Sequence, residues 1–95
     1  MKAIWNDTVI AESDDTIVVD GYHYFPRESL HWEFFVPSAT TSHCAWKGQA
    51  SYYSLEVHNK TNPDAAWYYE RPFPAAVRVK DRVGFWKGVQ IQGSS

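Results

Sequence analysis

The sequence predicts an all-β fold of two packed antiparallel sheets of short strands, or a partly closed barrel, with minimal helix. Composition is the first observation, because two leucines stand against nine valines, five Trp, six Tyr and five Phe. Valine and aromatic residues fit pleated surfaces. The second observation is that several segments alternate apolar and polar side chains between closely spaced turn residues. Both architectures leave an open concave end of the kind that small ligands occupy.

Length and charge narrow the class of protein. The 95 residues are enough for one domain, expected to span positions 1–95 with a frayed tail at 92–95. A net charge of −2 with scattered signs argues against nucleic acid and against an anionic membrane surface. Cys44 is the only cysteine, so an internal disulfide is excluded. No apolar run suits a signal peptide or a membrane span, and we expect a cytoplasmic protein.

Short strands separated by Asn, Asp and Gly turns make up the first part of the chain, which suggests an antiparallel meander. The strands expected there are 2–5, 8–12, 16–19 and 22–25. Pro26 ends the last of them because proline has no N–H to donate, and Arg27-Glu28-Ser29 forms a polar corner.

Alternation continues through the rest of the chain. Leu30, Trp32, Phe34 and Val36 share one face of an expected strand, and 38–42 is a polar connection that extended backbone also suits. The further strands expected are 49–57, 65–70, 82–86 and 89–91. Turns are expected at Lys47-Gly48, at 59–64 and at Lys87-Gly88, and 75–80 is a single helical turn or irregular.

The segment Ser42–Tyr53 is the strongest candidate for a site. It places the only cysteine, a histidine, a lysine and three aromatic residues around one glycine turn, and then continues into a strand. We expect it to form one wall of a site of small-molecule size, with the strand Ala66–Glu70 as the other wall.

Five strings of residues, spread over nearly the whole chain, resemble those of a known family. They are Tyr24-Phe25-Pro26-Arg27-Glu28, Ser42-His43-Cys44-Ala45-Trp46-Lys47-Gly48, Ala50-Ser51-Tyr52-Tyr53, Ala66-Trp67-Tyr68-Tyr69 and Val83-Gly84-Phe85-Trp86. The family is the bacterial proteins grouped as domain of unknown function 427. Ala45 stands where that family usually has proline, which loosens the turn after Cys44.

The resemblance implies a β-tent fold, in which two antiparallel sheets meet at an angle, as in methionine sulfoxide reductase B-like and Mss4-like domains. Those relatives often hold a structural zinc on four cysteines, which Cys44 alone cannot provide. We therefore expect no metal and no cofactor. The family sometimes carries a nucleotidyltransferase label, but the chain has no Gly-rich phosphate loop. Its one acidic pair, Asp14-Asp15, falls in an expected hairpin turn.

Two interpretations of Cys44 stay open. In the first, Cys44 is a reactive thiol whose pKa is lowered by Lys47 or by protonated His43. In the second, Cys44 is a small buried residue that packs as an apolar side chain, as most free cysteines do. Adjacent residues of an extended chain point to opposite sides, which places His43 poorly for activating Cys44. We favour the packing interpretation and expect no catalytic residue. Lys47 is read either as a cation at the pocket mouth or as a solvated turn residue.

The aromatic residues of the two walls are too numerous for so small a core, which favours pocket lining. Because side chains alternate along a strand, two sets of residues could line the pocket: Tyr52 with Tyr68, or Tyr53 with Trp67 and Tyr69. The expected ligand-binding residues are Arg27, Glu28, His43, Cys44, Trp46, Lys47, Tyr52, Tyr53, Trp67, Tyr69 and Glu70.

The function that the sequence favours is a small-molecule binding module with an aromatic pocket and a cationic rim. An anionic or nucleotide-like ligand suits those groups. One alternative is an enzyme that uses Cys44 in thiol or redox chemistry. Another is a protein-interaction module with a flat aromatic patch, and the sequence leaves a homodimer open.

Overall fold

The computed structural model describes residues 1–93, in which nine strands form two antiparallel sheets. The smaller sheet has the order β2-β1-β9, and the larger has the order β3-β4-β8-β7-β6-β5. This confirms the predicted all-β fold of two antiparallel sheets. The strands are β1 (Lys2–Trp5), β2 (Thr8–Glu12), β3 (Ile17–Val19), β4 (Tyr22–Pro26), β5 (Phe35–Cys44), β6 (Gly48–Val57), β7 (Lys60–Tyr68), β8 (Arg82–Phe85) and β9 (Gln90–Gln92).

The three 3-10 helices are short, and none in the described part of the chain is longer than six residues. They are η1 (Arg27–Ser29), η2 (Trp32–Phe34) and η3 (Pro74–Val79). The polar corner expected at 27–29 is η1, and most of the segment 75–80, expected to be a helical turn or irregular, lies in η3. Between residues 1 and 93, no helix is long and apolar enough to cross a membrane.

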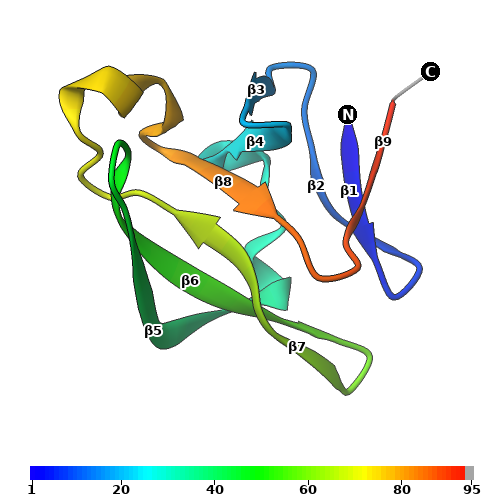
Figure 1. Cartoon of the computed structure of the whole chain (residues 1–95). Coiled ribbons are helices and arrows are strands. Elements are labelled where there is room, and N and C mark those ends of the chain that lie inside the picture. Colours follow the sequence, from blue (N-terminus) through cyan, green and yellow to red (C-terminus); the bar gives the residue numbers. More distant parts are fainter. Residues whose placement is uncertain (94–95) are drawn as a thin grey trace.

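The main core lies on one face of the larger sheet, which packs there against the smaller sheet. In Figure 1 the smaller sheet stands at the right, and the long strands β5, β6 and β7 run across the lower left. Phe25, Leu55 and Val83 from the larger sheet join Ala3 and Ile10 from the smaller sheet in one buried cluster. The burial of this apolar surface is the main force that holds the two sheets together.

A second buried cluster occupies the opposite face of the larger sheet. Tyr24, Ala50 and Trp67 pack there with Ala76 and Val79, which η3 contributes. Because η3 is short, it covers only part of this face. The rest of the face is available for a site.

The predicted strand over Leu30–Val36 is wrong. Leu30 makes a single bridge to Ala11, Trp32–Phe34 forms η2, and the strand begins only at Phe35. Local hydrogen bonds favour the turn, since the Phe34 N–H donates to the His31 carbonyl at 3.1 Å. The polar connection expected at 38–42 is extended and belongs to β5, the edge strand of the larger sheet.

Two further boundaries differ from the prediction. The turn expected at 59–64 is limited to His58 and Asn59, both at positive φ, and β7 already begins at Lys60. Gln92 was placed in a frayed tail, but it pairs with Lys2 in the smaller sheet. Residues 94 and 95 of that predicted tail lie outside the described residues.

Candidate functional site

The register of three neighbouring strands decides which aromatic residues share a face. Tyr52 lies opposite Trp67, and Trp67 lies opposite Gly84. Since side chains alternate along a strand, Tyr69 follows Trp67 on this face, and Tyr53 lies on the other face. The expected groupings were therefore wrong, because the structure joins Tyr52 to Trp67 and Tyr69.

The first hollow, here called the aromatic hollow, has a volume of about 170 Å³ and opens on the face that η3 only partly covers. Trp67 forms part of its wall, with its ring edge-to-face against Tyr22 at 4.9 Å and Trp86 at 5.8 Å. The rings of Tyr52 and Trp86 are 6.5 Å apart and tilted by 32°. The lining residues are Tyr22, Tyr24, Lys47, Tyr52, Trp67, Tyr69 and Trp86.

Gly84 allows Trp67 to take this position. A Cβ atom on Gly84 would lie 2.7 Å from Cζ2 of Trp67, closer than non-bonded carbon atoms approach. The indole therefore lies directly on the backbone of β8. Its Nε1 donates a hydrogen bond to the Tyr24 hydroxyl at 3.2 Å, which fixes the ring.

Lys47 is the buried charge of the aromatic hollow. The residue is 7% exposed, and its Nζ donates to Oδ2 of Asp20 at 2.7 Å. Burial disfavours the ammonium form, but the hydrogen bond to Asp20 and the phenols of Tyr24 and Tyr69 outweigh it, so the pKa of Lys47 is raised. Lys47 is therefore neither a solvated turn residue nor an unpaired cation, since Asp20 neutralises it.

Trp86 is held at the hollow by Asp64. The indole Nε1 of Trp86 donates to the Asp64 carbonyl at 2.6 Å. The Asp64 carboxylate accepts from Ser38 at 2.5 Å and Thr40 at 2.8 Å, both on β5. These two hydroxyl groups lower the pKa of Asp64. One residue of β7 thus connects the edge strand to the wall of the hollow.

The second hollow, here called the arginine hollow, opens on the opposite face of β7 and has a volume of about 260 Å³. Its aromatic wall is the stacked pair Tyr53 and Tyr68, whose rings are 4.8 Å apart. The lining residues are Arg27, Tyr53, Tyr68, Tyr69, Glu70, Asp81 and Arg82. Tyr69 lines both hollows.

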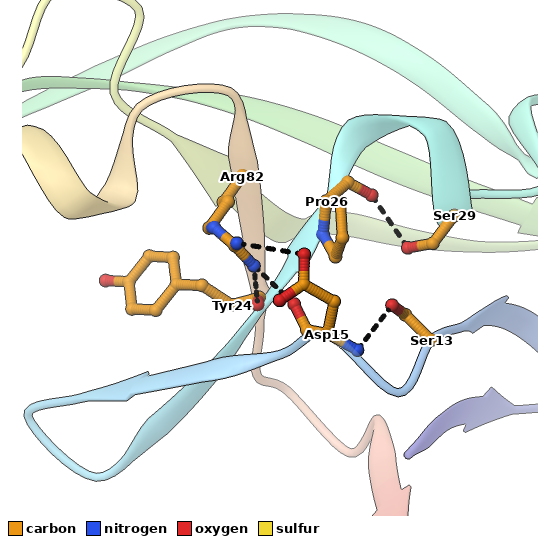
Figure 2. Close-up of polar contacts among 6 residues, drawn as sticks. All are labelled: Ser13, Asp15, Tyr24, Pro26, Ser29 and Arg82. Atoms are coloured by element: carbon orange, nitrogen blue, oxygen red, sulfur yellow. Dashed lines mark hydrogen bonds and ion pairs between the residues drawn. The ribbon is translucent and has the colours of Figure 1, made fainter.

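The two arginine residues of this hollow differ in their partners. Arg82 forms an ion pair with the Asp15 carboxylate at 3.3 Å and also donates to the carbonyls of Asp15 and Tyr24 (Figure 2). Arg27 donates to the Tyr53 hydroxyl at 3.1 Å and lies over the Trp32 ring at 4.6 Å. Within residues 1–93, no carboxylate forms an ion pair with Arg27.

Cys44 is partly buried at the end of β5 and packs beside the second core cluster. The backbone N–H of Trp46 hydrogen bonds to the thiol and is the largest influence on its pKa. Burial opposes this effect, whereas the N–H and the charge of Lys47 add to it, so the pKa of Cys44 is lowered. Gly48, at φ +110°, closes this turn in a conformation that favours glycine.

The structure distributes the predicted site residues over two places instead of one pocket. Lys47, Tyr52, Trp67 and Tyr69 line the aromatic hollow. Arg27, Tyr53, Tyr69 and Glu70 line the arginine hollow.

Four predicted residues line neither hollow: Glu28, His43, Cys44 and Trp46. His43 is exposed on β5 and meets the Phe73 ring edge-to-face at 6.2 Å. Glu28 is exposed on η1, and Trp46 is 42% exposed, with Lys47 Nζ 5.0 Å from its ring centroid.

The expected site did not include Tyr22, Tyr24 and Trp86 of the aromatic hollow or Asp81 and Arg82 of the arginine hollow. Tyr68 was considered as pocket lining but is not among the expected ligand-binding residues. Tyr22 and Tyr24 alternate in one strand, and Trp86 follows the Val83-Gly84-Phe85 string, so both signals were present in the sequence. What was missing is the pairing of β4 with β8, which brings the two segments together. In residues 1–93, no group of three or more His, Cys, Asp or Glu residues is placed to hold a metal ion.

Comparison with known proteins gives one assignment. None of the curated proteins compared with the chain matches it. A family model described as a domain of unknown function, DUF427, matches residues 1–93, which is nearly the full 95 residues. The chain therefore belongs to the DUF427 family.

Proposed function

We propose that the protein is a small-molecule binding module that holds a flat ring in the aromatic hollow. The observation that carries this proposal is the set of rings around Trp67, which leaves about 170 Å³ unfilled on an exposed face. Exposed aromatic surface costs free energy in water, and a ring that stacks there removes it from water. The concave shape supports a small molecule over the flat partner surface that a protein-interaction module would use.

The charge of the hollow favours a neutral ring over an anionic group. Asp20 neutralises Lys47, so Lys47 offers no free positive charge to a phosphate or carboxylate. A nucleoside base has the flat shape and polar edge that suit rings with nearby hydroxyl groups. Adenosine and its 5′-monophosphate are therefore informative probes, and we expect the phosphate to add little affinity.

The first prediction concerns Trp86 as a wall of this hollow. A titration with adenosine, followed by tryptophan fluorescence and by thermal stability, should be saturable in the wild-type protein. Trp86→Ala should weaken binding roughly tenfold, because a base stacked on an aromatic ring contributes about 1–3 kcal/mol. The matched control is Trp46→Ala, since Trp46 is similarly exposed, 42% against 40%, and also has a lysine Nζ over its ring.

The control variant Trp46→Ala should leave the affinity unchanged. Equal losses in both variants would show that the hollow itself does not bind the ring. If neither adenosine nor a panel of other ring-bearing metabolites stabilises the wild-type protein, the proposal is wrong.

A second candidate function, thiol chemistry at Cys44, is favoured by one observation: the N–H groups of Trp46 and Lys47 stabilise its thiolate. The second prediction is that native Cys44 reacts with iodoacetamide, forming an S–C bond and releasing iodide, with a midpoint in pH below that of an unperturbed thiol. The same chain unfolded in urea is the control. A native midpoint at or above the unfolded one would remove this candidate.

A further inference from the structure

We infer that the arginine hollow is a second binding site, for a small zwitterion that carries a carboxylate beside an ammonium group, as a free α-amino acid does. The site is on the face of β7 opposite to the aromatic hollow and has different chemistry. The inference does not depend on the proposed function.

Arg27 is the group that would bind the carboxylate. A guanidinium has five N–H donors, and within residues 1–93 that of Arg27 forms one hydrogen bond, to the Tyr53 hydroxyl. The Trp32 ring at 4.6 Å and the Tyr68 ring at 5.8 Å hold the group in place without using its remaining donors. A positioned guanidinium with free donors matches a carboxylate in a two-bond arrangement.

Glu70 and Asp81 are the groups that would bind the ammonium. Both line the same hollow and are exposed. The ion pairs in residues 1–93 join Lys2 to Glu12, Lys47 to Asp20 and Arg82 to Asp15, so neither Glu70 nor Asp81 belongs to one.

Asp81 is held close to the arginine by the backbone. The Arg27 N–H donates to the Asp81 carbonyl at 3.1 Å. Among residues 1–93, the hollow thus combines a guanidinium and two carboxylates that form no ion pair with one another or with other side chains. A ligand with both charges would satisfy both kinds of group.

The size of the hollow supports a small ligand. Its volume of about 260 Å³ lies below the range of roughly 300–1,000 Å³ for pockets that hold drug-sized molecules. The stacked rings of Tyr53 and Tyr68 provide an apolar wall for a short aliphatic side chain. A single amino acid fits this volume and this apolar wall better than a peptide.

The test compares probes that differ in one charged group. Glycine and L-leucine are the zwitterions, 4-methylpentanoate lacks the ammonium, and 3-methylbutylamine lacks the carboxylate. None of them has a ring, so none can stack in the aromatic hollow. NMR titration should show saturable shifts at the Arg27 Nε–H and at the backbone amides of Glu70 and Asp81, with Trp86 unchanged. L-leucine should bind at least tenfold more tightly than either analogue.

Two charge variants locate the site. Glu70→Gln removes an exposed carboxylate outside the core, so it should fold, and it should weaken L-leucine binding roughly tenfold while 4-methylpentanoate is unaffected. Glu56→Gln, at an exposed glutamate outside the hollow, is its control. Arg27→Gln should weaken both ligands, whereas Arg78→Gln, at an exposed arginine on η3, should weaken neither.

Three results would overturn the inference. The first is the absence of a saturable shift with glycine and L-leucine up to their solubility. The second is equal affinity for L-leucine and one of its analogues. The third is an unchanged L-leucine affinity in Glu70→Gln, which decides the question even if Arg27→Gln fails to fold.

Discussion

At position 84 the sheet requires a residue without a side chain. The Trp67 indole lies on the Gly84 backbone, is 7% exposed, and is fixed by its hydrogen bond to Tyr24. The ring cannot move away from an added methyl group without losing that bond and its packing. Gly84 is therefore a condition for the aromatic hollow.

The third prediction is that Gly84→Ala destabilises the protein by about 1–3 kcal/mol, because an added carbon overpacks a filled site. Urea denaturation monitored by circular dichroism measures this change. Gly93→Ala is the control, since no atom lies within 4 Å of a Cβ atom built there. Alanine normally suits a strand better than glycine, so equal or greater stability of Gly84→Ala would contradict the packing seen here.

At the scale of elements, one line of irregularities crosses three neighbouring strands. The register shifts between Pro37 and Thr41 on β5 and between Tyr53 and Leu55 on β6, and Asp64 on β7 has φ +55°. Bulges of this kind bend and twist a sheet. Asp64 spans them, because its carboxylate accepts from β5 and its backbone N–H donates to Ser54 at 3.1 Å.

The fourth prediction separates the charge of Asp64 from its backbone conformation. Asp64→Asn keeps a residue that tolerates positive φ and should lower stability modestly, whereas Asp64→Ala should lower it more. Since hydrogen bonds hold the pKa of Asp64 below its usual range, its contribution is present above the unfolded pKa and is lost as pH falls through the folded pKa. Thermal melts across acidic pH measure this. An Asn variant with the same acid dependence as the wild type would contradict it.

The alternation of apolar and polar residues predicted the strands that bury one face. It failed where turn or side-chain hydrogen bonds determine the secondary structure. The strand 49–57 was predicted well because Tyr53, Leu55 and Val57 enter the core together. The segment 30–36 alternates equally well, yet residues 32–34 form η2 and the strand begins only at Phe35. The strand β7 crosses Pro63 and Asp64 because side-chain bonds hold that bulge, and a local pattern cannot show such bonds.

At the scale of the whole molecule, the buried phenols make the free energy of unfolding decrease at alkaline pH. Burial is the main cause that raises the pKa of Tyr69 to about 12, and it raises the pKa of Tyr24 and Tyr68 as well. A group whose pKa is raised in the folded state contributes its full stabilisation at pH values below its unfolded pKa, which is about 10 for tyrosine. That contribution is lost as pH rises toward about 12.

The fifth prediction is that Tyr69→Phe flattens this decline. Without the phenol, the free energy of unfolding should fall less between pH about 10 and about 12. The difference from the wild type is ~2–3 kcal/mol, since one unit of pKa corresponds to about 1.4 kcal/mol. Urea titrations across this range measure it, with Tyr22→Phe, at an exposed ring, as the control. Identical pH dependence in Tyr69→Phe and wild type would contradict the prediction.

The sequence predicted one pocket between two walls, whereas the structure places residues of these walls around two hollows. Residues of the walls Ser42–Tyr53 and Ala66–Glu70 line the two hollows. The composition indicated these segments, because their aromatic residues are too numerous for so small a core. The division into two hollows depends on register, which places Tyr52 against Trp67 and Tyr53 against Ala66. The neutralisation of Lys47 depends on Asp20, which is distant in sequence.

Tyr69 is the side chain that the two hollows share, and it is 6% exposed. A ligand in one hollow that displaced this ring would alter the shape of the other hollow. Two ligands would then be thermodynamically coupled through one phenol, and each would change the affinity of the other by the same factor.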